Sequence, residues 1–128
     1  MKRFFILGQM IVYSLMLMAT TALAQDPLEV APDMYKLLLE NDRVRVMEVS
    51  FKPGEKIDTH SHPDHVAYIA SGGTLSITEQ GKEPQDIVAT DGQVLWLDAQ
   101  THSAVNVGQT DIKIVVVELK EPRPTAEK

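Results

Sequence analysis

Short runs of alternating apolar and polar residues, separated by turns, dominate the chain from position 43 onward. Side chains on a β-strand alternate between its two faces, so this period of two predicts strands that bury one face. No helical period persists over ten residues between 35 and 120. The sequence therefore predicts an all-β sandwich or barrel of eight or nine short strands. The expected strands are 43–51, 56–62, 65–71, 74–78, 86–90, 93–97, 102–107 and 112–119.

The first 24 residues have the features of a cleavable signal peptide. Lys2 and Arg3 precede a nearly continuous apolar run at 4–18, and Ala22-Leu23-Ala24 forms a cleavage site. A membrane-spanning helix needs about 20 apolar residues, which is longer than this run. We therefore expect 1–24 to be removed and the protein to be exported, periplasmic or secreted, with no membrane attachment afterwards. An uncleaved membrane anchor is the alternative.

The rest of the chain is long enough for one small domain. Two prolines and no clear period predict an N-terminal arm at 25–38, followed by the domain at 39–120 and a flexible tail at 121–128. The formal net charge is −6 and there is no basic cluster, which argues against nucleic acid as a partner. The absence of cysteine excludes disulfides and thiolate ligands.

Three of the four histidines lie within the segment DTHSHPDH at 58–65. His60 and His62 are two residues apart on an expected strand, so their side chains share a face. Pro63 and Asp64 form a corner that returns His65 toward the same place. His102, at the start of another expected strand, is the candidate for a fourth ligand. An accidental surface cluster, or a purely structural role for His102, is the alternative.

Four histidines at strand starts predict a divalent metal site formed by His60, His62, His65 and His102. Imidazole binds several transition metals, so iron, manganese, zinc and nickel all stay open. Tetrahedral zinc held by all four would be a closed structural site. An octahedral ion would keep two positions for water or substrate. Catalytic residues other than the ligands are not identifiable from the sequence.

The chain resembles the cupins across about residues 40–120. Their first motif is matched by Gly54, His60-Ser61-His62, His65 and Gly72, with His65 at the position of the family's glutamate. The second motif is matched by Gly92, His102 and Asn106, although Asp98 and Gln100 replace its proline and glycine. The segments ENDRVRVMEV, HSHPDHVAY, VLWLDAQTHSAVNVG and VVVEL are also similar to small cupins associated with β-alanine degradation.

This resemblance implies a single-domain jelly-roll β-barrel with a metal site inside, and often a homodimer. It implies an open site at which a small organic acid or diketone-like substrate chelates the metal for dioxygenase or lyase chemistry. Two alternatives stay open. One is a non-catalytic cupin that binds a metal or a small ligand, and the other is a barrel with structural zinc whose surface binds a partner.

Four polar residues are candidates for supporting roles. Asp64 could orient a neighbouring histidine, or it could be a solvated loop residue. Asn106 shares the strand face of His102, and the alternative is an edge hydrogen bond. Arg45 and Glu118 lie in apolar strands and are expected to be outward-facing charges, with a buried pair as the alternative.

The side chains around His65 follow from the same alternation. Ala67 and Ile69 share its face and are expected to line the cavity, whereas Tyr68 faces away. We expect Tyr68 and Trp96 to be core or wall residues.

Overall fold

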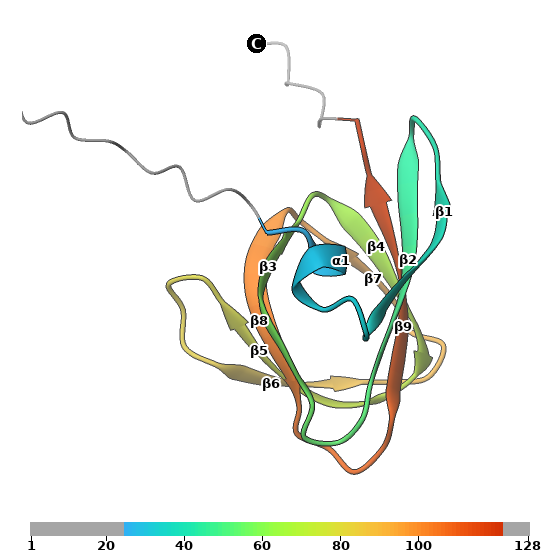
Figure 1. Cartoon of the computed structure of the whole chain (residues 1–128). Coiled ribbons are helices and arrows are strands. Elements are labelled where there is room, and N and C mark those ends of the chain that lie inside the picture. The colour runs from blue at the N-terminus through green and yellow to red at the C-terminus, as the bar shows by residue number, and fades with distance from the viewer. Residues whose placement is uncertain (1–24, 122–128) are drawn as a thin grey trace, which may run out of the picture.

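The computed structural model describes residues 25–121, which form two antiparallel β-sheets and one short helix (Figure 1). The expected signal peptide at 1–24 lies outside the described residues, as does most of the expected tail. No helix between 25 and 121 is long and apolar enough to cross a membrane. The elements are α1 (Pro27–Val30), β1 (Tyr35–Glu40), β2 (Val44–Phe51), β3 (Lys56–His62), β4 (His65–Ser71), β5 (Gly73–Glu79), β6 (Gln85–Ala89), β7 (Val94–Leu97), β8 (Gln100–Asn106) and β9 (Ile112–Leu119).

The strands are divided between a five-stranded and a four-stranded sheet. Their orders are β1-β2-β9-β4-β7 and β3-β8-β5-β6. This is the jelly-roll arrangement that the sequence predicts, except that the sheets are not closed into a barrel. No strand of one sheet pairs with a strand of the other among the described residues, so the two layers are held together by side-chain packing.

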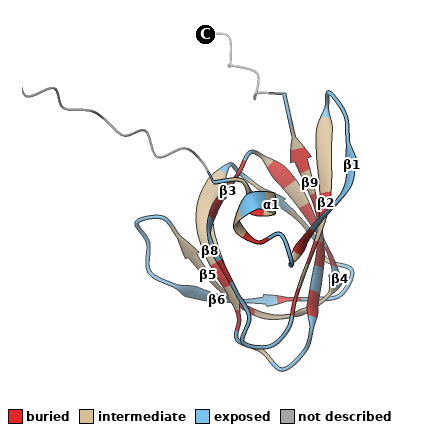
Figure 2. Ribbon diagram, in the orientation of Figure 1, coloured by how far each residue is buried: buried red, intermediate tan, exposed pale blue. Residues whose placement is uncertain are grey.

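The inner faces of both sheets form the core, and Figure 2 shows buried positions along strands of both sheets. In β2 and β9 alternate residues are buried, as the period of two predicts. In β3 a register shift between Ile57 and His60 leaves both residues buried although they are three apart. The buried apolar side chains include Met47, Val49, Phe51, Ile57, Ala67, Ile69, Leu75, Ala104, Ile112, Ile114 and Val116.

Residues 25–38, expected to be an arm, contain α1 and the start of β1. The Asp26 side chain accepts a hydrogen bond from the Leu28 amide and so caps α1, and Pro27 suits the first helical position. The amide of Ser61, on β3, donates to the backbone oxygen of Gln25. Tyr35 then begins the edge strand β1, so this segment is tied to both sheets.

Candidate metal centre

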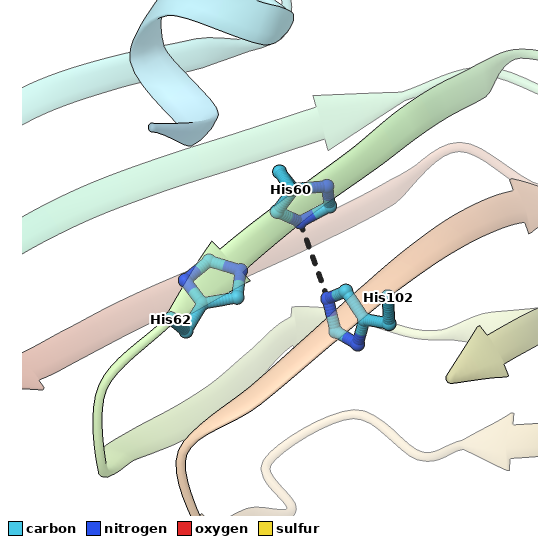
Figure 3. A group of neighbouring side chains, drawn as sticks. All are labelled: His60, His62 and His102. Carbon is cyan, nitrogen blue, oxygen red and sulfur yellow. Dashed lines mark hydrogen bonds between the residues drawn. The ribbon is translucent and has the colours of Figure 1, made fainter. Parts of the chain in front are cut away.

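Three of the predicted ligands meet on the inner face of the smaller sheet. His60 and His62 project from β3, and His102 projects from the neighbouring strand β8, directly opposite His60 in the strand register. Figure 3 shows the three rings turned toward one another. Their potential ligand atoms all lie within 4.8 Å of one another. Strand pairing therefore brings together residues that are about 40 positions apart in sequence.

The spacing of the nitrogens suits a shared ion. Nε2 of His60 lies 3.2 Å from Nε2 of His102. Two nitrogens bound to one metal at about 2.0–2.1 Å are separated by roughly 3.0–3.4 Å, depending on the coordination geometry. The same separation also permits an N–H···N hydrogen bond between the rings. The pair can thus hold a proton or a cation between its nitrogens.

Hydrogen bonds at Nδ1 set the protonation of two of these rings. Nδ1 of His60 lies 2.7 Å from the Asp58 carbonyl oxygen, and Nδ1 of His62 lies 2.7 Å from Oε1 of Glu118. Both partners are acceptors, so Nδ1 carries the hydrogen and Nε2 keeps its lone pair for a ligand. Metal-binding histidines are usually oriented by such contacts. The donor set therefore fits a divalent cation.

His102 differs from the other two. Its Nδ1 is buried and has no hydrogen-bond partner in the described part of the chain. Burial, and then the neighbouring imidazoles, lowers the pKa of His102 to about 3, and burial lowers the pKa of His60 to about 4. Both rings are consequently neutral at pH 7, which is the state that binds metal.

His65 lies beside this group but is not part of it. It projects from β4 in the other sheet, and its ring centroid is 4.8 Å from that of His62. Its Nδ1 lies 2.8 Å from the Pro63 carbonyl oxygen, which leaves Nε2 unprotonated, and burial lowers its pKa. The structure thus brings three of the four predicted ligands together and places the fourth next to them. Its role as a ligand stays a prediction.

Arg45 and Glu118 form a buried ion pair, so the expectation that both face outward is wrong. Glu118 is 3% exposed, and its Oε2 accepts hydrogen bonds from the Arg45 guanidinium at 2.8 Å. The remaining guanidinium nitrogen of Arg45, Nη1, donates to Asp26 at 2.5 Å. Burial alone would raise the pKa of Glu118, but the hydrogen bonds from His62 and Arg45 outweigh it and lower that pKa. Glu118 is therefore an ionised carboxylate in contact with a candidate ligand.

A cavity of about 180 Å³ lies between the sheets with the histidines in its wall. Most of its lining is aliphatic, and Ala67 and Ile69 contribute to it as predicted. The Tyr35 hydroxyl reaches the polar end, 3.3 Å from Nε2 of His60, and burial raises the pKa of Tyr35, so the hydroxyl stays protonated. Glu79, opposite His102 in the register of β5 and β8, also lines the cavity.

The other candidates have structural or surface positions. Asp64 Oδ1 accepts a hydrogen bond from the Ala99 amide, which fixes the turn before β8. Asn106 is buried and bonds to backbone groups of the neighbouring loops, among them the oxygens of Phe51 and Thr110. Tyr68 and Trp96 are 45% and 54% exposed, so neither is a core residue, and the prediction that Tyr68 faces away from His65 is confirmed. Both lie on the outer face, because they alternate with inward-facing neighbours.

Sequence reasoning missed Tyr35, Glu79 and Asp26 as neighbours of the site. Tyr35 belongs to the segment expected to be an arm, and Asp26 contacts Arg45 only through the tertiary fold. Glu79 had a usable signal, because it is a charged residue directly after the predicted strand 74–78.

Comparison with known proteins identifies the fold. No protein-family profile matches the chain, and no curated protein matches it. Solved structures do match. A cupin domain from Bordetella pertussis Tohama I is 26% identical, with a TM-score of 0.64 over 69% of this chain and 93% of that one. The association with β-alanine degradation stays a prediction.

Two further structures give the same fold at lower similarity. An RmlC-like cupin with a double-stranded β-helix fold from Methanocaldococcus jannaschii is 17% identical, with a TM-score of 0.55 over 66% of this chain and 77% of that one. A predicted oxalate decarboxylase from Thermotoga maritima is 24% identical, with a TM-score of 0.51 over the same shares.

Proposed function

We propose that this chain, which belongs to the cupin superfamily, is an exported protein that binds one divalent metal ion and acts on a small organic acid or diketone-like substrate. His60, His62 and His102 would hold the ion, with His65 as the fourth ligand. The reaction class would be that of a dioxygenase or a lyase. Export, the limits of the domain at 39–120 and a homodimeric state are parts of this proposal.

One observation supports the metal site most directly. His60 and His62 can offer their Nε2 atoms to a ligand in the cavity, because their Nδ1 atoms are occupied by acceptors. When bound, a divalent ion supplies Lewis acidity that polarises a substrate oxygen. Around it, Glu118 orients His62, and the protonated Tyr35 hydroxyl can donate a hydrogen bond to a substrate oxygen. The aliphatic walls exclude water from the remaining space.

A non-catalytic role in binding a metal or a small ligand is the second candidate. The observation that favours it is the composition of the cavity wall. Apart from the histidines, only Tyr35, Glu79 and Gln100 contribute polar side chains to it among the described residues. Tight ligand binding without turnover in the presence of iron or manganese would support this candidate over the enzyme.

Metal analysis of the mature protein, purified from its own export compartment, tests the proposal. We expect about one equivalent of a divalent metal in the natural protein and much less after His62→Ala, with the β-sheet content preserved. Thr101→Ala, which changes the residue beside His102 on the same strand, is the matched control and should keep the metal. Full metal retention by His62→Ala would contradict the site. Oxygen uptake or product formation with candidate acids then separates the enzyme from the binding protein.

A further inference from the structure

We propose that the cavity selects a ligand with a single chelating head, at most one negative charge and an apolar tail, and that it rejects dicarboxylates. This inference rests on the proposed function, because it takes the histidine end of the cavity as the place where the head binds. It goes further by defining the rest of the ligand. The head could be a 2-oxo acid or a β-diketone.

The size and lining of the cavity define the tail. Its volume is about 180 Å³, and its walls away from the histidines are aliphatic side chains from both sheets, among them Ile57, Leu75 and Ile114. An apolar cavity of about 150 Å³ is known to hold benzene. Because the head takes part of this volume, the space suits a tail of no more than about four carbons. A polar tail would lose its hydration without gaining hydrogen-bond partners.

The charged side chains around the cavity disfavour a second carboxylate on the ligand. No lysine or arginine contributes to the cavity wall in the described part of the chain. The nearest guanidinium, that of Arg45, is already paired with Glu118 and Asp26. Glu79, the one carboxylate in the cavity wall among the described residues, is paired with Lys82 at the surface. A dianion would therefore bury its second charge without a partner, which is strongly unfavourable.

Three 2-oxo acids with the same head test the proposal by calorimetric titration of the zinc-loaded protein. Pyruvate has a methyl tail, 4-methyl-2-oxopentanoate has an isobutyl tail, and 2-oxoglutarate has a tail that ends in a carboxylate. Each buried methylene tightens binding about fourfold, so the isobutyl acid should bind at least about tenfold more tightly than pyruvate. We expect 2-oxoglutarate to bind at least about tenfold more weakly than the isobutyl acid. Equal or tighter binding of 2-oxoglutarate, or no binding of any of the three, would overturn the inference.

Ala89→Leu is the variant that tests the tail site specifically. Ala89 lines the cavity and pairs with Gly73, which is six residues along β5 from Glu79, the partner of His102. A leucine there fills apolar space away from the metal ligands. We expect unchanged zinc stoichiometry and pyruvate affinity, and loss of most of the preference for the isobutyl acid. A retained preference would show that the tail binds elsewhere.

A second measurement separates this inference from the metal site. If the protein binds none of iron, manganese, zinc and nickel, the proposed function fails, but the apolar cavity can still be tested without metal. Toluene should then shift the NMR methyl resonances of Leu75 and Ile114, and Ala89→Leu should weaken the effect. The absence of such shifts in the unsubstituted protein would overturn the inference.

Discussion

Replacing Glu118 with glutamine should weaken metal binding, although Glu118 is not among the candidate ligands. Its Oε1 lies 2.7 Å from Nδ1 of His62, and its Oε2 accepts from Arg45. The carboxylate therefore holds the His62 ring in place and raises the electron density on Nε2. Glutamine has nearly the same shape, but it carries no charge. Its NH2 group replaces one carboxylate oxygen and so faces an N–H donor, either that of His62 or that of Arg45.

The expected size of the effect follows from these contacts. Loss of a group that orients a metal-binding histidine typically costs 10–100-fold in affinity, or about 1.4–2.8 kcal/mol. The free energy of unfolding of the metal-free protein should also fall by about 2 kcal/mol, because a buried charge-assisted hydrogen bond is lost and Arg45 keeps only Asp26. Metal affinity and stability should thus both decrease.

Competition against a chelator measures the metal affinity, and urea unfolding of the metal-free protein measures stability. Glu48→Gln is the matched control, because Glu48 lies on neighbouring β2 in a more exposed pair with Lys113, 3.6 Å apart. It should change both quantities little, as surface ion pairs usually do. If Glu118→Gln destabilises the protein but leaves the metal affinity within about twofold of the unsubstituted value, Glu118 is purely structural and the reasoning fails.

Four further outcomes are expected. The pKa values of His60 and His102 are lowered to about 4 and about 3 in the folded protein, against an ordinary value of about 6.5. Below pH 6.5 the unfolded chain therefore binds more protons than the folded protein. Urea unfolding of the metal-free protein should then show a stability that falls between pH 6.5 and 4. A stability that rises on acidification would contradict this. A saturating divalent metal should raise the free energy of unfolding by about 2.7 kcal/mol at one hundred times its dissociation constant, and a chelator should reverse the gain in a thermal melt. Asp26→Asn should cost less stability than Glu118→Gln in the same urea assay, because the Asp26 side chain is 35% exposed. Gly72→Ala should lower the free energy of unfolding by about 2–4 kcal/mol, since an added Cβ would lie 2.2 Å from the Ala89 backbone oxygen. A loss as small as that of an ordinary surface substitution, about 0.5 kcal/mol or less, would refute that reasoning.

The period of two in the sequence was sufficient to predict most strands and the inner face of each. It also placed His60 and His62 on one face, because the two residues lie after the register shift in β3. His102 was assigned to the site as the remaining histidine at a strand start and through the cupin motif, because nothing local indicates that β8 pairs with β3. Sheet topology is a long-range property, and strand alternation contains no information about it.

The expectation from the sequence was wrong for the ion pair of Arg45 and Glu118. Arg45 shares a strand face with Met47 and Val49, and Glu118 shares one with Ile114 and Val116, so parity alone places both on the inner face. The expectation that charged residues face water overrode that signal. Whether the charges of Arg45 and Glu118 neutralise each other depends on the pairing of β2 with β9, whose register sets the two residues opposite each other.

The same register places Glu118 beside His65, the residue that matches the cupin glutamate in the sequence. Glu118 lies between Arg45 on β2 and His65 on β4, directly opposite each. Its carboxylate contacts His62, one of the candidate ligands. Arg45, Glu118 and Asp26 together carry one net negative charge, which favours a cation at the histidines while leaving their nitrogens neutral. A divalent ion held by neutral imidazoles would keep its full charge, which favours an anionic chelating head on the ligand.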